Sequence, residues 1–479
     1  MPKLSMHSKI CKQHRIYQWI REALEDGISF VVNHKEQFRT KPSCFTRKRF
    51  YTVEKFLTTL CKLTNLPLAS SIFNAQVPED KANCPSISSF IQYRKKFSLE
   101  AFRVFFQKTL YSIFKKVKRK LYRKRYTVCA IDGSDFSTPT DLMKEKELLE
   151  GAENNSDISR LKEDKEEADA MKRAQRTVQN RKLHVNALFD VLNLLYLAVE
   201  MHPKLRCNEA ATLVSILQNM LEVNKDLVPS NMILLADRGY EGYGVLAWLA
   251  LTGFRFVFRV KSPSSNGILR NKSYRLQSGR IIDQTITFYV IQNADGSFEK
   301  ADSEIKGVTK AITIRVISKR LKDGSYAYWL TNLMGSSTPG ADEQETFTRK
   351  DVYNLYKKRW EIETSFRFLK YGFGAICFHS KSMEHQKMEI YAAMTMMNCV
   401  MTIVTRTPVK DNPNNGHKYK INCTVAVSFC MEYLFCKTIT EKALERLLQR
   451  NKVEIISGRH FPRAKTHKDK TRYFCYRPR

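Results

Sequence analysis

Hydrophobic positions recur at helical spacing through the first quarter of the chain. Residues 86–117, SISSFIQYRKKFSLEAFRVFFQKTLYSIFKKV, alternate apolar and basic positions with the period of a helix. Ser98 precedes LEAF and is a suitable N-cap, because its hydroxyl oxygen can accept a hydrogen bond from the first helical turn. The pattern predicts that residues 1–125 form a helical region.

At Tyr126 the pattern changes to short apolar runs that end in turn residues. YTVCAIDGSDF and NMILLADRGYEGY each predict a buried strand, and these strands end at Asp132 and Asp237. KLHVNALFDVLNLLYLAVEM predicts two strands with a turn near Asp190 and Asn193, whereas NEAATLVSILQNMLE and GVLAWLALTGF predict helices. This order of elements predicts a mixed α/β core, whose first part covers residues 126–253.

Strand patterns dominate the next stretch, which we assign to a β-rich insertion at residues 254–335. Its segments FRFVFRV, RIIDQTITFYVI, AITIRVISKRL and SYAYWLTNL are rich in β-branched and aromatic residues. Asp295-Gly296 and Asp323-Gly324 predict hairpin turns within it.

The core resumes over residues 336–405. Thr348, with Asp351 three residues later, predicts the start of a helix that stops at Gly372. A second helix is predicted near 383–405, where MEIYAAMTMMNCVMTIV reads as a buried helix. Residues 406–479 are predicted to be helical and basic, with a polar break at 411–416 and a helix near 423–450.

The distribution of apolar residues indicates neither a membrane-spanning protein nor a secreted one. The chain has no run of about 18 apolar residues, and its N-terminus, MPKLSMHSKICKQHR, lacks the apolar part of a signal peptide. Its twelve cysteines include no CxxC pair and fit reduced thiols. The sequence predicts a cytoplasmic protein that makes no membrane contact.

The charge balance adds a polyanionic partner to this picture. The chain carries 81 Lys and Arg against 48 Asp and Glu, a formal net charge of +33. Residues 115–125 hold eight basic residues and no acid, and ten basic against two acidic residues follow from position 450 onward. Nucleic acid is the usual partner of such a chain, because each neutralised phosphate releases counterions. A solvated helix face and a disordered tail are the simpler alternatives for the two clusters. Residues 144–182 mix both charges and predict a solvent-exposed insertion.

One face of the helix predicted after Thr348 concentrates four polar side chains. Tyr356, Arg359, Glu363 and Lys370 are spaced by three, four and seven residues, which places them within about 60° of one another on a helix. A carboxylate flanked by cations at the edge of a core is costly unless it binds a metal, forms an ion pair or meets a polyanion. A simple Arg359–Glu363 pair one turn apart remains an alternative.

Three carboxylates are placed where they could converge. Asp132 and Asp237 follow apolar strands, and ligands gather at the carboxyl ends of strands in α/β sheets, while Glu363 lies on the later helix. Converging carboxylates with no His or Cys favour Mg²⁺, which in pairs can activate a nucleophile and stabilise a leaving oxygen in phosphoryl transfer. Strand-end Asp residues also cap ordinary turns. Three other carboxylates are weaker candidates for this site. Asp135 lies past the strand end, Asp190 lies at a turn, and Glu361 lies on another side of its helix from Glu363.

The run Tyr356-x2-Arg359-x3-Glu363-x6-Lys370 resembles the YREK signature of the bacterial insertion-sequence-four family of transposases. The likeness covers roughly residues 40–405, and the segments that share it are SISSFIQYRKKFSLEAF, AIDGSDF, LHVNALFDVLN and LLADRGYEGY. The resemblance implies an α/β fold with an RNase H-like mixed-sheet catalytic core interrupted by the β-rich insertion. An N-terminal helical DNA-binding region and a helical, basic C-terminus flank this core.

The same resemblance implies a function. Asp132, Asp237 and Glu363 would form a catalytic triad that binds Mg²⁺, for which Mn²⁺ can substitute. Tyr356, Arg359 and Lys370 would hold DNA phosphates, as their side chains suit. The partner would be double-stranded DNA, namely the element's terminal inverted repeats and target DNA, and the protein would act as a homodimer. Trp329 could stack a flipped base, although its segment reads better as an apolar strand.

Two other functions fit parts of the pattern. An RNase H-like nuclease without strand transfer would need the three carboxylates but not the cationic face. A non-catalytic, transposase-derived DNA-binding protein would keep the basic regions and could lose a carboxylate, whereas all three are present. The sequence therefore favours a transposase that cleaves the ends of its own element and joins them to target DNA.

Overall fold

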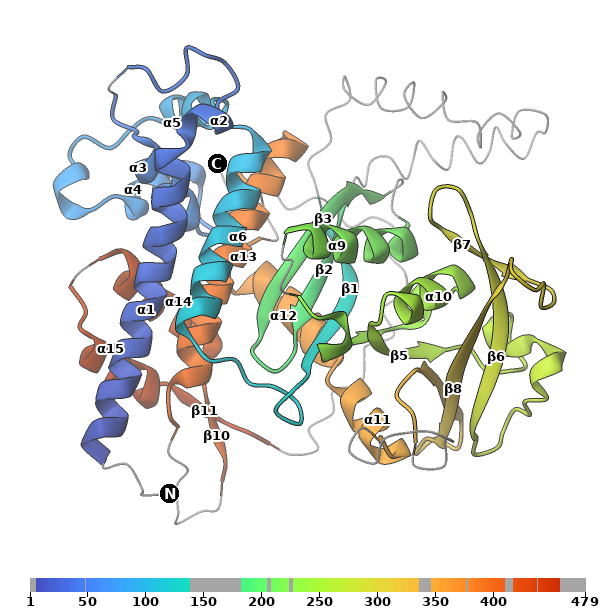
Figure 1. The fold of residues 1–479 in the computed structure, drawn as a ribbon. Helices are drawn as coiled ribbons and strands as arrows, with labels where there is room; N and C mark the ends of the chain where they lie inside the picture. The colour runs from blue at the N-terminus through green and yellow to red at the C-terminus, as the bar shows by residue number, and fades with distance from the viewer. Residues whose placement is uncertain are drawn as a thin grey trace, which may run out of the picture. The chain divides into compact units, whose positions relative to one another are not determined.

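The computed structural model describes residues 6–47, 49–137, 182–204, 208–223, 227–335, 346–375, 378–409, 417–436 and 438–456. The charged insertion predicted at 144–182 lies outside these residues except for Lys182, and so do the polar break at 411–416 and the basic tail beyond 456. The chain divides into two compact units (Figure 1). One takes residues 1–118, 135–184 and 367–479, and the other takes residues 119–134 and 185–366.

The first unit is built from helices. Its elements are α1 (Met6–Asn33), α2 (Lys35–Phe38), α3 (Val53–Cys61), α4 (Leu68–Ala75), η1 (Pro78–Asp80), α5 (Ile87–Arg94), α6 (Leu99–Lys116), α13 (Met383–Arg406), β10 (Tyr419–Ile421), α14 (Cys423–Phe435), α15 (Glu441–Arg450) and β11 (Lys452–Glu454). The long helices α1, α6 and α13 pack against one another (Figure 1). The helix predicted near 423–450 is two helices, because the chain leaves the helical conformation at Cys436, the extended C-cap of α14.

Helix α13 carries the most apolar stretch of the chain. By length and composition alone it could cross a membrane, but 83% of its most apolar window is buried inside the structure. A core helix passes the same test, so this is weak evidence for a membrane span. The packing of α13 against α1, α6, α3 and α14 matches the buried helix predicted for this segment.

The second unit contains most of a nine-stranded sheet. The strands are β1 (Thr127–Ser137), β2 (Lys182–Asp190), β3 (Leu195–Pro203), β4 (Met232–Ala236), β5 (Arg255–Val260), β6 (Asp283–Gln292), β7 (Phe298–Ala301), β8 (Lys310–Arg320) and β9 (Tyr326–Thr331). Their order in the sheet is β3-β2-β1-β4-β5-β9-β8-β6-β7. The turn predicted between β2 and β3 is present, with Leu194 at φ 58°.

The sheet combines parallel and antiparallel pairs of strands. β1, β4 and β5 run parallel, whereas β9 pairs antiparallel with β5, and β8, β6 and β7 continue in antiparallel pairs. Gly296 and Gly324 adopt φ values of 82° and 81°, which glycine tolerates and which the predicted Asp-Gly turns require. The mixed α/β fold with a large mixed sheet, predicted from the sequence, is therefore confirmed. The strands predicted as an insertion are hydrogen-bonded into the same sheet as β1 and β4.

Helices and short turns connect the strands. They are α9 (Glu209–Val223), η3 (Pro229–Asn231), η4 (Arg238–Tyr240), α10 (Tyr243–Leu251), η5 (Ile268–Arg270), η6 (Lys272–Tyr274), α11 (Arg349–Lys357) and α12 (Trp360–Tyr371). Every residue of β4 is buried, as expected for a parallel strand covered on both faces. The core therefore surrounds the strand that leads to Asp237.

The helix predicted from Thr348 to Gly372 begins and ends as expected but is broken in the middle. Thr348 and Asp351 form a capping box at the start of α11, and α12 ends at Tyr371, just before Gly372. A turn at Lys358 and Arg359 separates the two helices, so the prediction of one continuous helix is wrong. The charges suit this break, since cations favour the C-terminus of a helix and acids, here Glu361 and Glu363, favour the start of the next.

Candidate active site

The two strand-end aspartates occupy neighbouring strands. β1 and β4 are parallel, and Ala130 is the register partner of Leu235. Continuing this register by two residues sets Asp132 beside Asp237. β1 itself runs on to Ser137, so Asp132 lies within the strand and not at its end as predicted. The residues of β1 that pair with β4 are Thr127–Ala130.

Main-chain hydrogen bonds hold both aspartates in place. Oδ1 of Asp132 accepts a bond of 2.9 Å from the amide of Gly133, and Oδ1 of Asp237 accepts one of 2.9 Å from the amide of Gly239. Asp237 is thereby the N-cap of η4. In both aspartates the main-chain bond uses Oδ1 and not Oδ2.

Arg359 connects the helical part of the site to the strands. Its Nη2 donates to Oε1 of Glu363 over 2.7 Å, and its Nη1 lies 3.4 Å from Oδ2 of Asp132. Its Nε donates to the hydroxyl of Tyr356 over 3.2 Å. The Arg359 side chain is only 7% exposed, so its ion pairs lie largely out of water. The turn between α11 and α12 allows one guanidinium to reach both Tyr356 behind it and Glu363 ahead.

The electrostatics of the site disfavour the ionised form of Asp132. Burial, helped by the charges of Asp237 and Glu363, raises the pKa of Asp132 to about 7, although Arg359 and the Gly133 amide oppose the shift. For Arg359 burial opposes the charged form, but Tyr356, Asp132 and Glu363 outweigh it and raise its pKa. A further cation near Asp132 would therefore be bound favourably.

No metal site is complete among the residues that the structure describes. Within them, no group of three or more His, Cys, Asp or Glu side chains is arranged to hold a metal ion. The reason is visible at Asp132 and Glu363, which both face the guanidinium of Arg359. The donors themselves are hard carboxylate oxygens of the kind that Mg²⁺ prefers.

Lys370 has a different environment from the other three residues of the predicted helix face. Its Nζ donates to the main-chain carbonyl of Asp135 over 2.7 Å. Burial lowers the pKa of Lys370, and the nearby Asp135 opposes this shift. The carboxylate of Asp135 accepts from Nδ1 of His184 at 2.6 Å, so the first rival of Asp132 is engaged with a histidine.

The other two rival carboxylates have structural surroundings. Asp190 accepts hydrogen bonds from the amides of Leu192 and Asn193 and from the Asn193 side chain, which is the turn role expected of it. Glu361 is exposed on α12, while Ile362 beside it is buried. Trp329 is only 2% exposed, and its ring lies edge-on to Tyr356 at 5.7 Å, so the stacking role considered for it would need a rearrangement.

Comparison with protein families completes this picture. The family model of the transposase DDE domain matches residues 123–399, which is more than half of the chain. The chain belongs to the transposase DDE domain family. Membership supports a DNA transposase, and DDE transposases generally use divalent metal ions.

Two further comparisons add little to the DDE domain assignment. No curated protein sequence matches the chain. Among solved structures, the cryo-EM structure of a piggyBac transposase synaptic complex with hairpin DNA is similar at 9% identity and a TM-score of 0.40. That likeness covers 92% of this chain and 82% of the other, and a score at this level supports no conclusion.

Two residues of the DDE domain were missed from the sequence. Arg259 lies on β5, one residue beyond the register pair Ala236 and Phe258, which sets it beside Asp237. Trp360, the first residue of α12, is 51% exposed, and the Arg359 guanidinium lies 5.5 Å from its ring centre. Arg259 sits in the apolar run FRFVFRV, where hydropathy gives no sign of a polar role, whereas Trp360 lies between Arg359 and Glu361.

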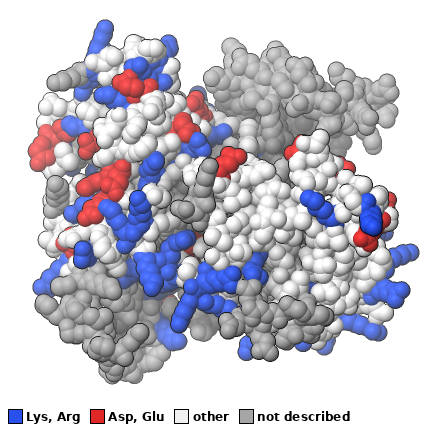
Figure 2. All heavy atoms as spheres, viewed as in Figure 1, with Lys and Arg blue, Asp and Glu red and all other residues white. Residues whose placement is uncertain are grey.

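The basic cluster at residues 115–125 is partly neutralised. Lys116 pairs with Glu22 at 2.8 Å, and Arg123 pairs with Asp351 at 3.2 Å. Figure 2 nevertheless shows exposed Lys and Arg side chains on the drawn face of the protein. This surface agrees in sign with a DNA partner.

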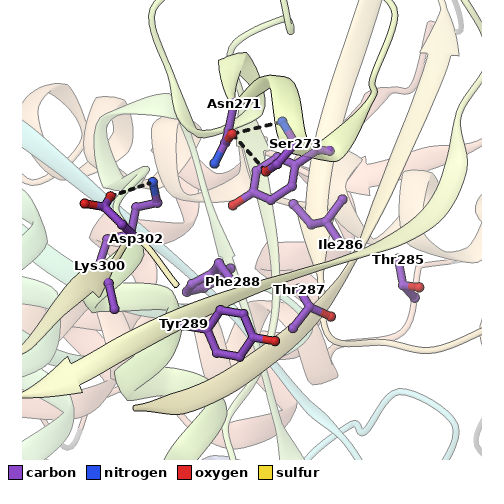
Figure 3. Close-up of a pocket in the computed structure, with 11 residues that line it drawn as sticks. Asn271, Ser273, Thr285, Ile286, Thr287, Phe288, Tyr289, Lys300 and Asp302 are labelled. Carbon is purple, nitrogen blue, oxygen red and sulfur yellow. Dashed lines mark hydrogen bonds and ion pairs between the residues drawn. The ribbon is translucent and has the colours of Figure 1, made fainter. Parts of the chain in front are cut away.

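A cavity of about 370 Å³ lies away from these carboxylates. Figure 3 shows that it opens among the β6 side chains Thr285 and Thr287, Lys300, and the Asn271–Ser273 turn. None of the predicted site residues lines it. The candidate active site is therefore defined by charge and hydrogen bonding and not by this cavity.

Proposed function

We propose that the chain is a transposase of the insertion-sequence-four family that cleaves the ends of its own element and joins them to target DNA. Membership of the DDE domain family supports the reaction class. The observation that carries the proposal is the Arg359 guanidinium, which pairs with both Asp132 and Glu363, while the register of β1 and β4 sets Asp237 beside Asp132. An RNase H-like core, with the five-part division predicted from the sequence, is part of the same proposal.

Asp132, Asp237 and Glu363 would hold Mg²⁺, or Mn²⁺ in its place. Their oxygens suit these ions, and a bound cation would offset the burial that raises the pKa of Asp132. When bound, the metal would supply activation of the attacking oxygen and stabilisation of the leaving one.

The remaining residues would bind and orient DNA. Arg359 can grip a phosphate with two parallel hydrogen bonds once its carboxylate partners bind a cation instead. Tyr356 keeps the guanidinium oriented through its hydroxyl, and Lys370 would add a positive charge to a phosphate further along the DNA. Two DNA ends must be brought together for transposition, so the proposal includes a homodimer on DNA. We also propose that the protein is located in the cytoplasm.

The test uses terminal inverted repeats from the DNA that flanks the reading frame. Duplexes carrying them are incubated with the full chain, with and without Mg²⁺, alongside Glu363→Gln. Cutting at the repeat boundary that needs both the metal and Glu363, followed by joining to a plasmid, is the expected result.

Two outcomes would replace the proposal. Cutting without joining to target DNA would indicate a nuclease, because the chemistry of cleavage would be present without strand transfer. Binding of the repeats without cleavage under any divalent metal would indicate a DNA-binding protein derived from a transposase, with Glu363 reduced to an ion-pair partner of Arg359.

A further inference from the structure

Arg259 completes a row of polar side chains across neighbouring strands. Asp132 on β1 and Asp237 on β4 share this row by register, and the register of β4 with β5 continues it to Arg259. On the far side of β5, Trp329 of β9 is the register partner of Arg259. Residues in register on adjacent strands point to the same face, with strands about 4.8 Å apart. Arg259 therefore lies one strand from Asp237.

The guanidinium of Arg259 is not compensated within the part of the chain that the structure describes. Its Nε is buried and has no hydrogen-bond partner there. None of the ion pairs between described residues includes Arg259, although Asp237 lies on the neighbouring strand. An uncompensated cation that is partly removed from water destabilises the fold. Its presence here therefore indicates that the position binds an anion.

The charges of Arg259 and Arg359 both act on the Tyr356 phenol. Burial raises the pKa of the Tyr356 phenol, and the charges of Arg359 and Arg259 both lower it. Tyr356 is therefore within electrostatic reach of two guanidinium groups. Arg359 is paired with carboxylates, whereas Arg259 has no carboxylate partner among the described residues.

We propose that Arg259 binds a phosphate of the DNA strand next to the cleavage site, through its two terminal Nη groups. The inference rests on the proposed function, because it names the anion that this second guanidinium meets beside Asp237. A phosphodiester is the anion that the proposed function brings beside Asp237, and a planar guanidinium offers paired donors that match two phosphate oxygens.

The same strand provides a matched control. Arg255 lies four residues earlier on β5, on the same face and with similar partial burial, but its Nε donates to the carbonyl of Ser230 over 3.0 Å. Its guanidinium also lies 5.5 Å from the ring centre of Tyr126. Arg255 is thus a structural arginine, and replacing either residue by methionine removes one charge from one strand.

The two variants should behave in opposite ways. Arg259→Met should leave the melting temperature of the DNA-free protein unchanged or raised, because an unpaired charge is removed. It should weaken binding of a repeat duplex by roughly ten- to a hundredfold and reduce the salt slope of binding by about one. Arg255→Met should lower the melting temperature and keep the salt slope.

Single neutral methylphosphonate linkages then locate the contact. At one position near the cut, the neutral linkage should weaken binding by the wild-type chain and leave Arg259→Met unaffected. An unchanged salt slope in Arg259→Met, or a loss of melting temperature like that of Arg255→Met, would overturn the inference. Metal-dependent cleavage by the wild-type chain is scored in parallel. If that cleavage is absent while the Arg259 effects persist, the proposed function fails and the phosphate contact stands.

Discussion

Arg359 donates a hydrogen bond of 2.7 Å from Nη2 to Oε1 of Glu363, one helical turn away. The same guanidinium lies 3.4 Å from Asp132, so the ion pair is one side of a three-residue bridge. The simple intrahelical pair and the catalytic role are therefore compatible. Arg359 supplies in this structure the positive charge that we assign to a metal ion in the working complex.

Arg359→Ala should destabilise the DNA-free protein and weaken DNA binding. Removing one partner from a buried ion pair costs about 3–5 kcal/mol, and the partial exposure of Glu363 should bring the loss below this. Urea unfolding measures the stability, and binding at several salt concentrations measures the DNA contact. Arg359→Lys should recover part of both. An unchanged salt slope in Arg359→Ala would leave the residue with a purely structural role.

Replacing any one of the three carboxylates by its amide should abolish Mg²⁺-dependent cleavage and preserve binding of the repeat duplex. The variants are Asp132→Asn, Asp237→Asn and Glu363→Gln. Glu361→Gln is the matched control, because Glu361 is exposed on the same helix as Glu363 and should cleave normally. Wild-type cleavage by an amide variant would remove that residue from the catalytic set.

Asp132 should make the metal-free protein less stable as pH rises. Its pKa is raised from 3.8 to about 7 in the folded state, so between these values the folded chain keeps a proton that the unfolded chain has lost. Stability should therefore fall through this window, by up to about 1.4 kcal/mol per pH unit, and level off above it.

The measurement compares the unfolding free energy of the wild-type chain with that of Asp132→Asn across the same pH range. The difference should grow from about pH 4 to about pH 7, and Mg²⁺ should flatten it by favouring the ionised carboxyl. A difference that does not vary with pH would mean that Asp132 is ionised throughout.

Two N-cap residues should respond differently to alanine. Thr348 accepts a hydrogen bond from the amide of Asp351, so Thr348→Ala should cost about 1 kcal/mol. Ser98 occupies the N-cap of α6 as predicted, but its buried hydroxyl has no partner among the described residues. Ser98→Ala should therefore be neutral or slightly stabilising. Equal losses of melting temperature in the two variants would contradict this distinction.

The sequence was informative where local patterns determine the structure. The strand leading to Asp237 was readable because a buried parallel strand is a short apolar run followed by a turn. Its neighbour was placed less accurately, since β1 passes Asp132 and continues to Ser137. The capping box at Thr348 was readable because both of its residues lie within one turn.

The features that were missed depend on long-range packing. The break at Arg359 is marked only by the run of cations before it, and helical spacing alone favoured a continuous helix. The role inferred for Arg259 depends on strand order, because nothing in FRFVFRV indicates that β4 lies beside it. The Asp132–Arg359 contact joins segments that no local pattern connects.

The antiparallel pairing of β9 with β5 has a consequence for engineering. Deleting residues 283–331 to obtain a smaller protein would strip β5 of one neighbour and turn an interior strand into an open edge. Exposed backbone donors and acceptors on an apolar strand invite pairing with other chains, so the shortened protein should aggregate. A trimmed version would need a substitute strand along β5 before its chemistry could be studied.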